Sequence, residues 1–228
     1  MTHRYNRVDT PQTSALPIAR AGYPFIYASA FGTLVFTLLE IPALSVVGLI
    51  ATAFTAFFFR DPERFVPEPE TAVVSPADGR IIRVQKLDEN PFIDGPCLKI
   101  SIFMSIFNVH VNRVPYKGTV KQTMYQPGKF FSANREAASM ENEHQAIVLE
   151  SKSGEILCFV QVAGLVARRI ICHLQPGDRV DRGERFGMIC FGSRLDVFLP
   201  SDTSPAVSAG DKVKAGQSVL ASLTGEER

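Results

Sequence analysis

The sequence predicts a mainly β protein whose sheet domain follows an N-terminal pair of apolar helices. Two observations carry this prediction. From residue 73 onward, short runs of alternating apolar residues are separated by turns rich in Gly and Pro. Between residues 21 and 59, by contrast, the only side chain that carries a charge is Glu40. The chain therefore changes from a lipid-compatible helical segment to a strand-forming one.

The composition limits the classes of protein that fit. The 228 residues are 46% hydrophobic, which is enough for one sizeable core and a membrane segment. A net charge of +1 argues against nucleic acid as a partner. The 4 cysteines form no Cys-x-x-Cys pair and indicate reduced, buried thiols. The sequence contains no motif of His, Cys and Asp typical of a metal site, so no metal is expected.

The apolar stretch 21–59 is predicted to be a membrane helical hairpin. It divides at Glu40-Ile41-Pro42 into halves of about 18 or 19 residues, each roughly 27 Å long as a helix and close to the thickness of the hydrocarbon core. Arginines flank it at Arg20, Arg60 and Arg64. The positive-inside rule then places both ends in the cytoplasm.

Two alternatives to a full span stay open. One is a shallow re-entrant hairpin, because Gly, Ala, Thr and Ser dilute the apolarity, and the other is a buried helical pair in a soluble protein. A signal peptide does not fit, since the apolar region is too long and starts too late. Residues 1–20 are expected to form a loose cytoplasmic tail, and the Pro-rich residues 60–72 a linker.

Residues 73–228 are predicted to form one β domain. Its strand-like runs are 98–104, 146–149, 156–162, 166–173 and 218–223, and one short helix is expected near 133–143. Two motifs occur twice: Gly-Asp-x-Val-x-x-Gly at 177–183 and 210–216, and Pro-x-x-Gly-x-[Ile/Val] at 76–81 and 115–120. Turns of the first kind are typical of lipoyl- and biotinyl-type domains. A barrel-sandwich core built from interleaved halves is therefore predicted.

The pair Gly192-Ser193 interrupts an apolar pattern that runs from Phe186 to Leu199. Alone, such a pair indicates a β-bulge. It also suits an N-to-O acyl shift, because Gly leaves its own carbonyl open to attack by the hydroxyl of the Ser that follows.

The surrounding motifs make this sequence similar to the short form of the phosphatidylserine decarboxylase proenzymes over roughly residues 20 to 225. The matching motifs are Phe59-Arg60-Asp61-Pro62-Glu63-Arg64, Ser75-Pro76-Ala77-Asp78-Gly79, Asn108-Val109-His110-Val111-Asn112-Arg113-Val114-Pro115, Arg168-Arg169-Ile170, Gly177-Asp178, Gly183-Glu184-Arg185-Phe186-Gly187-Met188-Ile189 and Phe191-Gly192-Ser193-Arg194. In longer members, a second His stands where this chain has Arg113.

The resemblance implies cleavage between Gly192 and Ser193. The products would be a β chain, 1–192, and an α chain, 193–228, which stay together as a heterodimer; any higher oligomer is left open. Ser193 would become a covalent pyruvoyl group, and no other cofactor is expected. This group would form a Schiff base with phosphatidylserine and release CO2 to leave phosphatidylethanolamine.

The resemblance also assigns roles to side chains. Ser193 is the nucleophile, His110 the base and Asp78 its orienting partner, in keeping with an imidazole that titrates near neutral pH. Further candidates, for binding the substrate phosphate or carboxylate or for lining the pocket, are Arg168, Arg169, Arg194 and His144. The protein is expected at the inner cell membrane, with its catalytic domain facing the cytoplasm.

Two other functions are considered. A non-enzymatic, membrane-tethered carrier or adaptor would need a modifiable Lys at a hairpin tip, whereas the nearest candidate, Lys212, lies inside the repeated motif. A zinc peptidase would need a His-x-His pair, and the segment around His110 lacks one.

Overall fold

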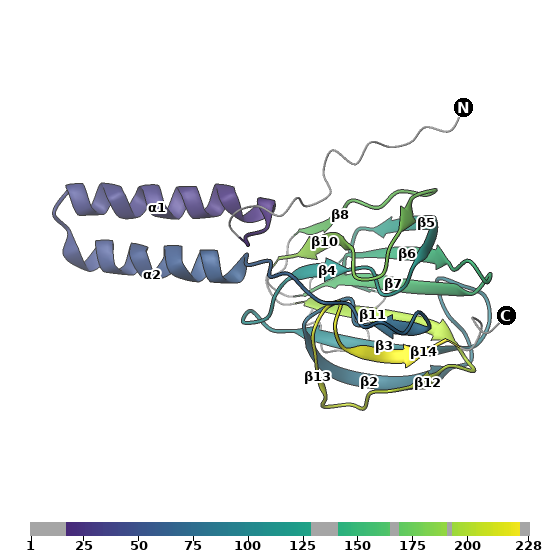
Figure 1. Cartoon of the computed structure of the whole chain (residues 1–228). Helices are drawn as coiled ribbons and strands as arrows, with labels where there is room; N and C mark the ends of the chain where they lie inside the picture. Colours follow the sequence, from purple (N-terminus) through teal and green to yellow (C-terminus); the bar gives the residue numbers. More distant parts are fainter. Residues whose placement is uncertain (1–16, 129–140, 165–168, 191–192, 224–228) are drawn as a thin grey trace. The chain divides into compact units, whose positions relative to one another are not determined.

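The computed structural model describes residues 17–128, 141–164, 169–190 and 193–223 (Figure 1). The chain divides into two compact units, Met1–Glu63 and Arg64–Arg228. This division falls inside the segment 60–72, for which the sequence predicts a linker. Most of the helix expected near 133–143, part of the run 166–173, and the residues Arg168 and Gly192 lie outside the described residues.

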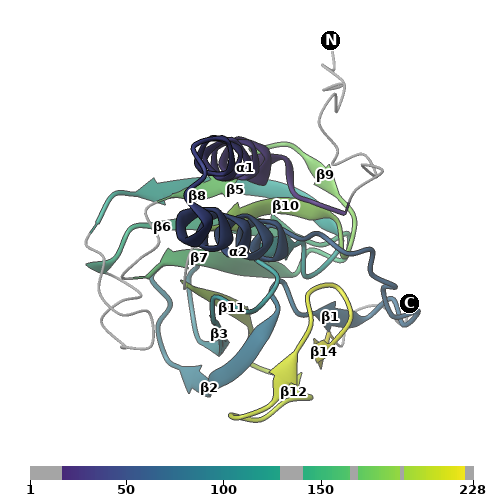
Figure 2. The ribbon, with the colours of Figure 1, turned by 90° about the vertical axis from the view of Figure 1, so that its left-hand side faces the viewer.

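The first unit contains a helical hairpin. A short 3₁₀ turn, Arg20–Gly22, leads into α1, Tyr23–Leu38, and α2 spans Pro42–Phe58. The chain reverses where the sequence predicts a break, with Glu40 in the left-handed region at φ 55°. The two helices lie side by side (Figures 1 and 2), and Thr33 Oγ1 lies 3.3 Å from Thr52 Oγ1. A Cβ added at Gly48 would lie 2.6 Å from Thr33 Oγ1, so a small residue there permits this close packing.

The hairpin leaves most of its apolar side chains uncovered. The exposed ones are Phe25, Tyr27, Phe31, Leu34, Leu38, Leu39, Ile41, Leu44, Val46, Val47, Leu49, Ile50, Phe54 and Phe57. Among the described residues, Arg20–Leu38 is the one helical segment long and apolar enough to cross a membrane, while α2 has 17 residues. Exposed apolar surface of this extent indicates association with lipid.

The second unit is built of strands, and the predicted mainly β class is confirmed. The strands are β1 Ala72–Val74, β2 Gly79–Leu87, β3 Cys97–Met104, β4 Val111–Arg113, β5 Gly118–Gln126, β6 His144–Glu150, β7 Ile156–Ala163, β8 Ile170–Cys172, β9 Arg179–Val180, β10 Arg185–Ile189, β11 Ser193–Pro200, β12 Ser204–Pro205, β13 Lys212–Val213 and β14 Val219–Ser222. Within the described residues they form a curled eight-stranded sheet, in the order β13-β2-β3-β11-β7-β6-β5-β9, and two three-stranded sheets, β1-β14-β12 and β4-β10-β8 (Figure 2). The main core lies against the face of the large sheet that carries Leu98, Ile100, Leu195 and Val197.

The two copies of Gly-Asp-x-Val-x-x-Gly form the same loop at opposite edges of the large sheet. In the first copy, Gly177 N donates to Val120 O (2.7 Å) and Val120 N to Asp178 O (2.8 Å). In the second, Gly210 N donates to Ile81 O (2.8 Å) and Ile81 N to Asp211 O (2.9 Å). The first and last glycines of both copies have positive φ, between 72° and 101°. These glycines therefore meet a backbone requirement that other residues satisfy only with strain.

In both copies of the Pro-x-x-Gly motif, the glycine lies where a neighbouring backbone leaves no room for a Cβ atom. A Cβ at Gly79 would lie 2.2 Å from Phe103 O, and one at Gly118 would lie 2.3 Å from Glu150 O. In each case the neighbouring strand approaches too closely for any side chain.

We expect Gly118→Ala to destabilise the β unit by roughly 1–3 kcal/mol, because the β5 and β6 backbones must separate. Thermal unfolding of the detergent-solubilised chain measures the loss. Gly32→Ala is the matched control, since an added Cβ there meets no atom within 4 Å. Equal midpoints for the two variants would contradict the steric explanation.

The four cysteines are free, and Cys97, Cys158 and Cys190 are buried. Burial raises the pKa of all four thiols, that of Cys172 to about 11. Thiolate is therefore scarce at neutral pH, as expected for small core residues rather than reactive thiols.

Candidate active site

Ser193 is the first residue of β11, a strand that lies between β3 and β7 in the large sheet. Its side chain is fully buried, and the residue pairs with Met104 on one side and Ala163 on the other. Because side chains alternate along a strand, Ser193 shares a face with Leu195 and the main core. Ser193, the residue that follows the predicted cleavage bond, thus lies buried at one end of a central strand.

The Ser193 hydroxyl takes part in a buried polar network. Its Oγ donates to Met104 Sδ at 3.4 Å, and Asn112 Nδ2 approaches the same sulfur at 3.8 Å. Gln161 Nε2 donates to Asn112 Oδ1 (2.9 Å) and to Ile171 O (3.3 Å), which fixes the orientation of the Asn112 amide. Gln161 Oε1 is buried and has no hydrogen-bond partner among the described residues.

Sequence reasoning did not single out Met104, Asn112 or Gln161. A signal existed for two of them, since Asn112 lies in the same motif as His110, and Gln161 is the one polar residue in the run 156–162. Their convergence depends on pairing between distant strands, which no local pattern reveals.

His110 is fully buried and directly precedes β4. In the pairing of β4 with β10, Val111 lies opposite Met188 and Asn112 opposite Gly187. The His110 motif therefore runs beside the strand that leads toward Ser193. Asn112, two residues after His110, contacts the sulfur that Ser193 contacts.

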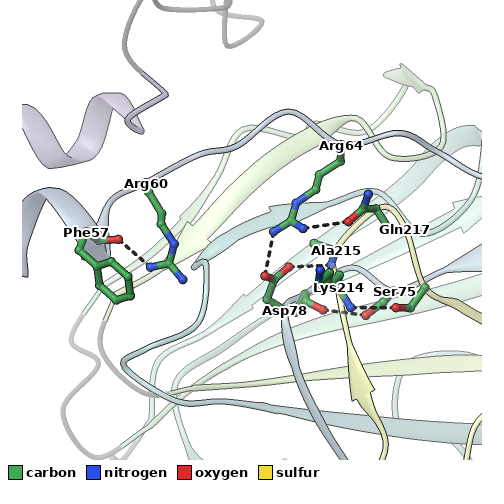
Figure 3. A network of polar contacts seen from close by, with 10 residues as sticks. Phe57, Arg60, Arg64, Ser75, Asp78, Lys214, Ala215 and Gln217 are labelled. Atoms are coloured by element: carbon green, nitrogen blue, oxygen red, sulfur yellow. Dashed lines mark hydrogen bonds and ion pairs between the residues drawn. The ribbon is translucent and has the colours of Figure 1, made fainter.

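Asp78 lies just before β2, at the same end of the large sheet as Ser193. Arg80, two residues after Asp78, pairs with Phe103 of β3, and Phe103 pairs with Arg194, the residue after Ser193 in β11. Both carboxylate oxygens accept hydrogen bonds (Figure 3): Oδ2 from Arg64 Nη2 at 2.9 Å, and Oδ1 from the Ala215 N–H at 2.8 Å.

The two arginines of the motif 59–64, Arg60 and Arg64, have different partners. Arg64 joins Asp78 and also donates to Gln217 Oε1 at 2.9 Å, which links the start of the β unit to the residue that directly follows the second copy of the repeat. In the helical unit, Arg60 donates to Phe57 O at 2.7 Å, and its guanidinium lies 3.9 Å from the centre of the Phe57 ring (Figure 3). Sequence reasoning assigned this motif no chemical role.

Arg194 lies on the opposite face of β11 from Ser193. It is 1% exposed, and its Nε lies 2.9 Å from Asp196 Oδ1. Lys99 Nζ lies 3.4 Å from the other oxygen of Asp196. A buried charge needs a partner of opposite charge, and the ion pair with Asp196 favours a structural role for Arg194.

Comparison with known proteins decides the family. A model of the family described as phosphatidylserine decarboxylase matches residues 51–221. The chain belongs to the phosphatidylserine decarboxylase family. A phosphatidylserine decarboxylase proenzyme of Desulfotalea psychrophila is 53% identical over 208 residues, which cover 91% of this chain and 97% of the relative. Proteins of the same name from Syntrophus aciditrophicus and Geotalea uraniireducens are 52% and 49% identical over 204 and 207 residues, covering 89% and 91% of this chain and 96% and 97% of the relatives.

As a member of the phosphatidylserine decarboxylase family, the chain is an enzyme, and a non-enzymatic carrier or adaptor and a zinc peptidase are set aside. The structure also argues against a carrier function, because Lys212 lies in β13, paired with Arg80, rather than at a hairpin tip. Within the described part of the chain, no group of three or more His, Cys, Asp and Glu side chains could hold a metal ion.

The remaining described candidates, His144 and Arg169, lie in different places relative to Ser193. His144 pairs with Val162, which pairs with Arg194, so register places His144 on the Arg194 face of the sheet. Its Nδ1 lies 2.8 Å from Asn142 O, and its ring packs edge-on against Phe92 at 5.7 Å. Arg169 is exposed, and its carbonyl accepts from Cys190 N at 3.3 Å. Substrate binding by these residues stays a prediction.

Proposed function

We propose that this chain is a self-processing phosphatidylserine decarboxylase, cut between Gly192 and Ser193, that forms phosphatidylethanolamine and CO2. The observation that carries the proposal is the buried Ser193 hydroxyl at the start of β11, directed at the sulfur of Met104. A thioether is a weak acceptor, so it leaves the hydroxyl available for nucleophilic attack. The His110 motif runs beside this position and supplies the base.

The maturation reaction balances with groups of the chain and water alone. Ser193 Oγ attacks the Gly192 carbonyl carbon, the C–N bond breaks, and the hydroxyl proton passes through His110 to the new amine. Abstraction of the Ser193 α-proton then expels the Gly192 carboxylate by breaking the Cβ–Oγ bond. The resulting dehydroalanine takes up water and loses ammonia, which leaves a pyruvoyl group in amide linkage at the new N-terminus.

The position of Ser193 fits a pyruvoyl group. Once formed, the group supplies a ketone that takes the substrate amine and an electron sink for the carbanion that loss of CO2 leaves. Asn112 and Gln161 would lie beside it, and Gln161 Oε1 offers an acceptor that no described residue satisfies. His110 would return the proton to the substrate carbon.

The topology supports a stable heterodimer of the β chain, 1–192, and the α chain, 193–228. After cleavage, β11 would remain paired with β3 from Ser193 to Pro200 and with β7 from Ser193 to Phe198. Two further strands of the α chain, β13 and β14, pair with β2 and β1, which belong to the β chain. These contacts would hold the chains together without a covalent bond.

The finer description of fold and location belongs to the same proposal. The two matching repeat loops and glycine contacts support a barrel-sandwich core of interleaved halves. The apolar hairpin supports attachment to the inner membrane, with both ends of the hairpin and the β unit on the cytoplasmic side.

Mass spectrometry of the purified chain, together with CO2 release from phosphatidylserine, tests the function. We expect two fragments that divide at 192/193, the smaller carrying an N-terminal pyruvoyl group, and activity in proportion to the cleaved fraction. Decarboxylase activity from a wholly uncut chain would reject the proposal.

We expect Asn112→Ala to slow cleavage by roughly 10- to 100-fold, because Gln161 Nε2 loses its acceptor and the site loses an oriented donor. Gel analysis of the cleaved fraction against time after cell-free synthesis measures the rate. Gln122→Ala, which removes an exposed amide on β5, is the control and should cleave at the wild-type rate. Normal cleavage by Asn112→Ala would show that the amide has no part in maturation.

A further inference from the structure

Exposed apolar side chains of the β unit are few and gather at one end of it. Among the described residues from Arg64 onward, the large apolar side chains that are exposed are Phe65 (89%), Phe107 (64%), Tyr125 (58%) and Ile106 (39%). We call these four residues the apolar rim. Scattered exposure would need no explanation, but exposure confined to one end of a domain indicates a contact surface.

Ile106 and Phe107 occupy the turn that joins two parts of the site. The turn follows Met104, the strand partner of Ser193, and ends shortly before His110. Asn108 holds it, because Asn108 Oδ1 accepts from Ser105 N (2.9 Å) and from Ser105 Oγ (2.8 Å). The two apolar side chains are thus presented on a fixed turn.

Tyr125 lies at the same end of the sheet, next to the last residue of β5. The neighbouring Gln126 pairs with His144, and His144 pairs with Val162. Val162 in turn pairs with Arg194, the residue after Ser193, so Tyr125 and Ser193 lie at the same end of the large sheet.

Phe65 follows Arg64, and the Arg64 guanidinium binds Asp78 at that end as well. The opposite end of β6 and β7, by contrast, closes in the polar turn 151–155, where Lys152 is exposed.

We propose that the apolar rim rests on the lipid bilayer and that the 105–108 turn inserts Ile106 and Phe107 at the level of the headgroups. The proposal rests on the proposed function, in which the substrate is a membrane phospholipid. The rim consists of separate side chains on three segments, dominated by aromatic rings, which is typical of an interfacial contact. Docking would bring the end of the β unit that carries Ser193 to the headgroup layer, so that a phospholipid reaches the site with its acyl chains still in the membrane.

Tryptophan fluorescence tests this docking directly, because the sequence contains no Trp. In the full-length Phe107→Trp chain, reconstituted in vesicles of phosphatidylcholine and phosphatidylglycerol, we expect blue-shifted emission that lipids brominated near the headgroup quench. Lys152→Trp, at the opposite end, is the control and should emit as a solvated indole without quenching. Matching spectra for the two variants would overturn the proposal.

Kinetics separate docking from damage to the site. For Phe107→Ser we expect about a 10-fold lower kcat/KM with phosphatidylserine in vesicles and an unchanged value with a short-chain, monomeric phosphatidylserine. An equal loss with both substrates would show that the turn supports the site itself, and the docking proposal would fail. An inactive, uncut wild-type chain would instead reject the proposed function.

Discussion

Replacing Ser193 with alanine is expected to leave one uncut chain of 228 residues without decarboxylase activity. The methyl group cannot attack the Gly192 carbonyl, and without cleavage no pyruvoyl group forms. Activity should fall by at least about 10³-fold, because both the nucleophile and the prosthetic group come from this one side chain. A denaturing gel and intact mass measure cleavage, and CO2 release measures activity.

The matched control for this prediction is Ser101→Ala. Ser101 is a buried serine of β3 and lies opposite Asp196, on the other face of the sheet from Ser193. Because Ser101 Oγ has no hydrogen-bond partner among the described residues, its removal should cost little stability. This variant should cleave and decarboxylate as the wild type does. A Ser193→Ala chain that still divides at 192/193 would assign cleavage to another nucleophile or to a contaminating protease.

Local patterns predicted the parts of the fold that depend on local chemistry. The helix break at Glu40-Ile41-Pro42 is readable because Pro42 can start a helix but cannot continue one, and α2 begins there. The repeated glycines are readable because positive φ and close backbone contact select Gly.

The arrangement of the site could not be read in the same way. Alternation shows that Ser193 and Arg194 point to opposite faces of β11, but which face meets the main core depends on the strands paired with it. The same uncertainty applies to His144, which register places on the Arg194 face. The contact of Asn112 with Met104, like that of Arg64 with Asp78, comes from packing that the sequence order does not show.

We expect His110→Ala to impair both cleavage and decarboxylation, each by roughly 10²- to 10⁴-fold, as is usual for the loss of a general acid-base group. In the proposed mechanism, His110 activates Ser193 during maturation and then returns a proton to the substrate carbon. Dividing CO2 release by the cleaved fraction separates the two effects. A His110→Ala chain that cleaves normally and keeps full specific activity would remove His110 from the mechanism.

Asp78→Asn is expected to slow cleavage strongly while the cleaved fraction keeps its specific activity, since no hydroxyl remains to be activated after maturation. The structure adds a competing explanation, because the Asp78 carboxylate also joins Arg64 and the Ala215 N–H. Arg64→Gln separates the two. It removes the cationic partner but keeps the carboxylate, which the Ala215 N–H still holds.

If the carboxylate orients His110, Arg64→Gln should cleave much faster than Asp78→Asn, although removal of the ion pair lowers the thermal stability of both. If Asp78 acts only by joining β2 to the 210–216 loop, the two variants should lose cleavage and thermal stability in parallel. Cleavage rates from a gel time course, set beside unfolding midpoints for the same preparations, decide between these roles. We expect the first outcome, because in the proposed mechanism the Asp78 carboxylate orients His110 and so acts on the reaction barrier, whereas a joining contact acts on the free energy of unfolding.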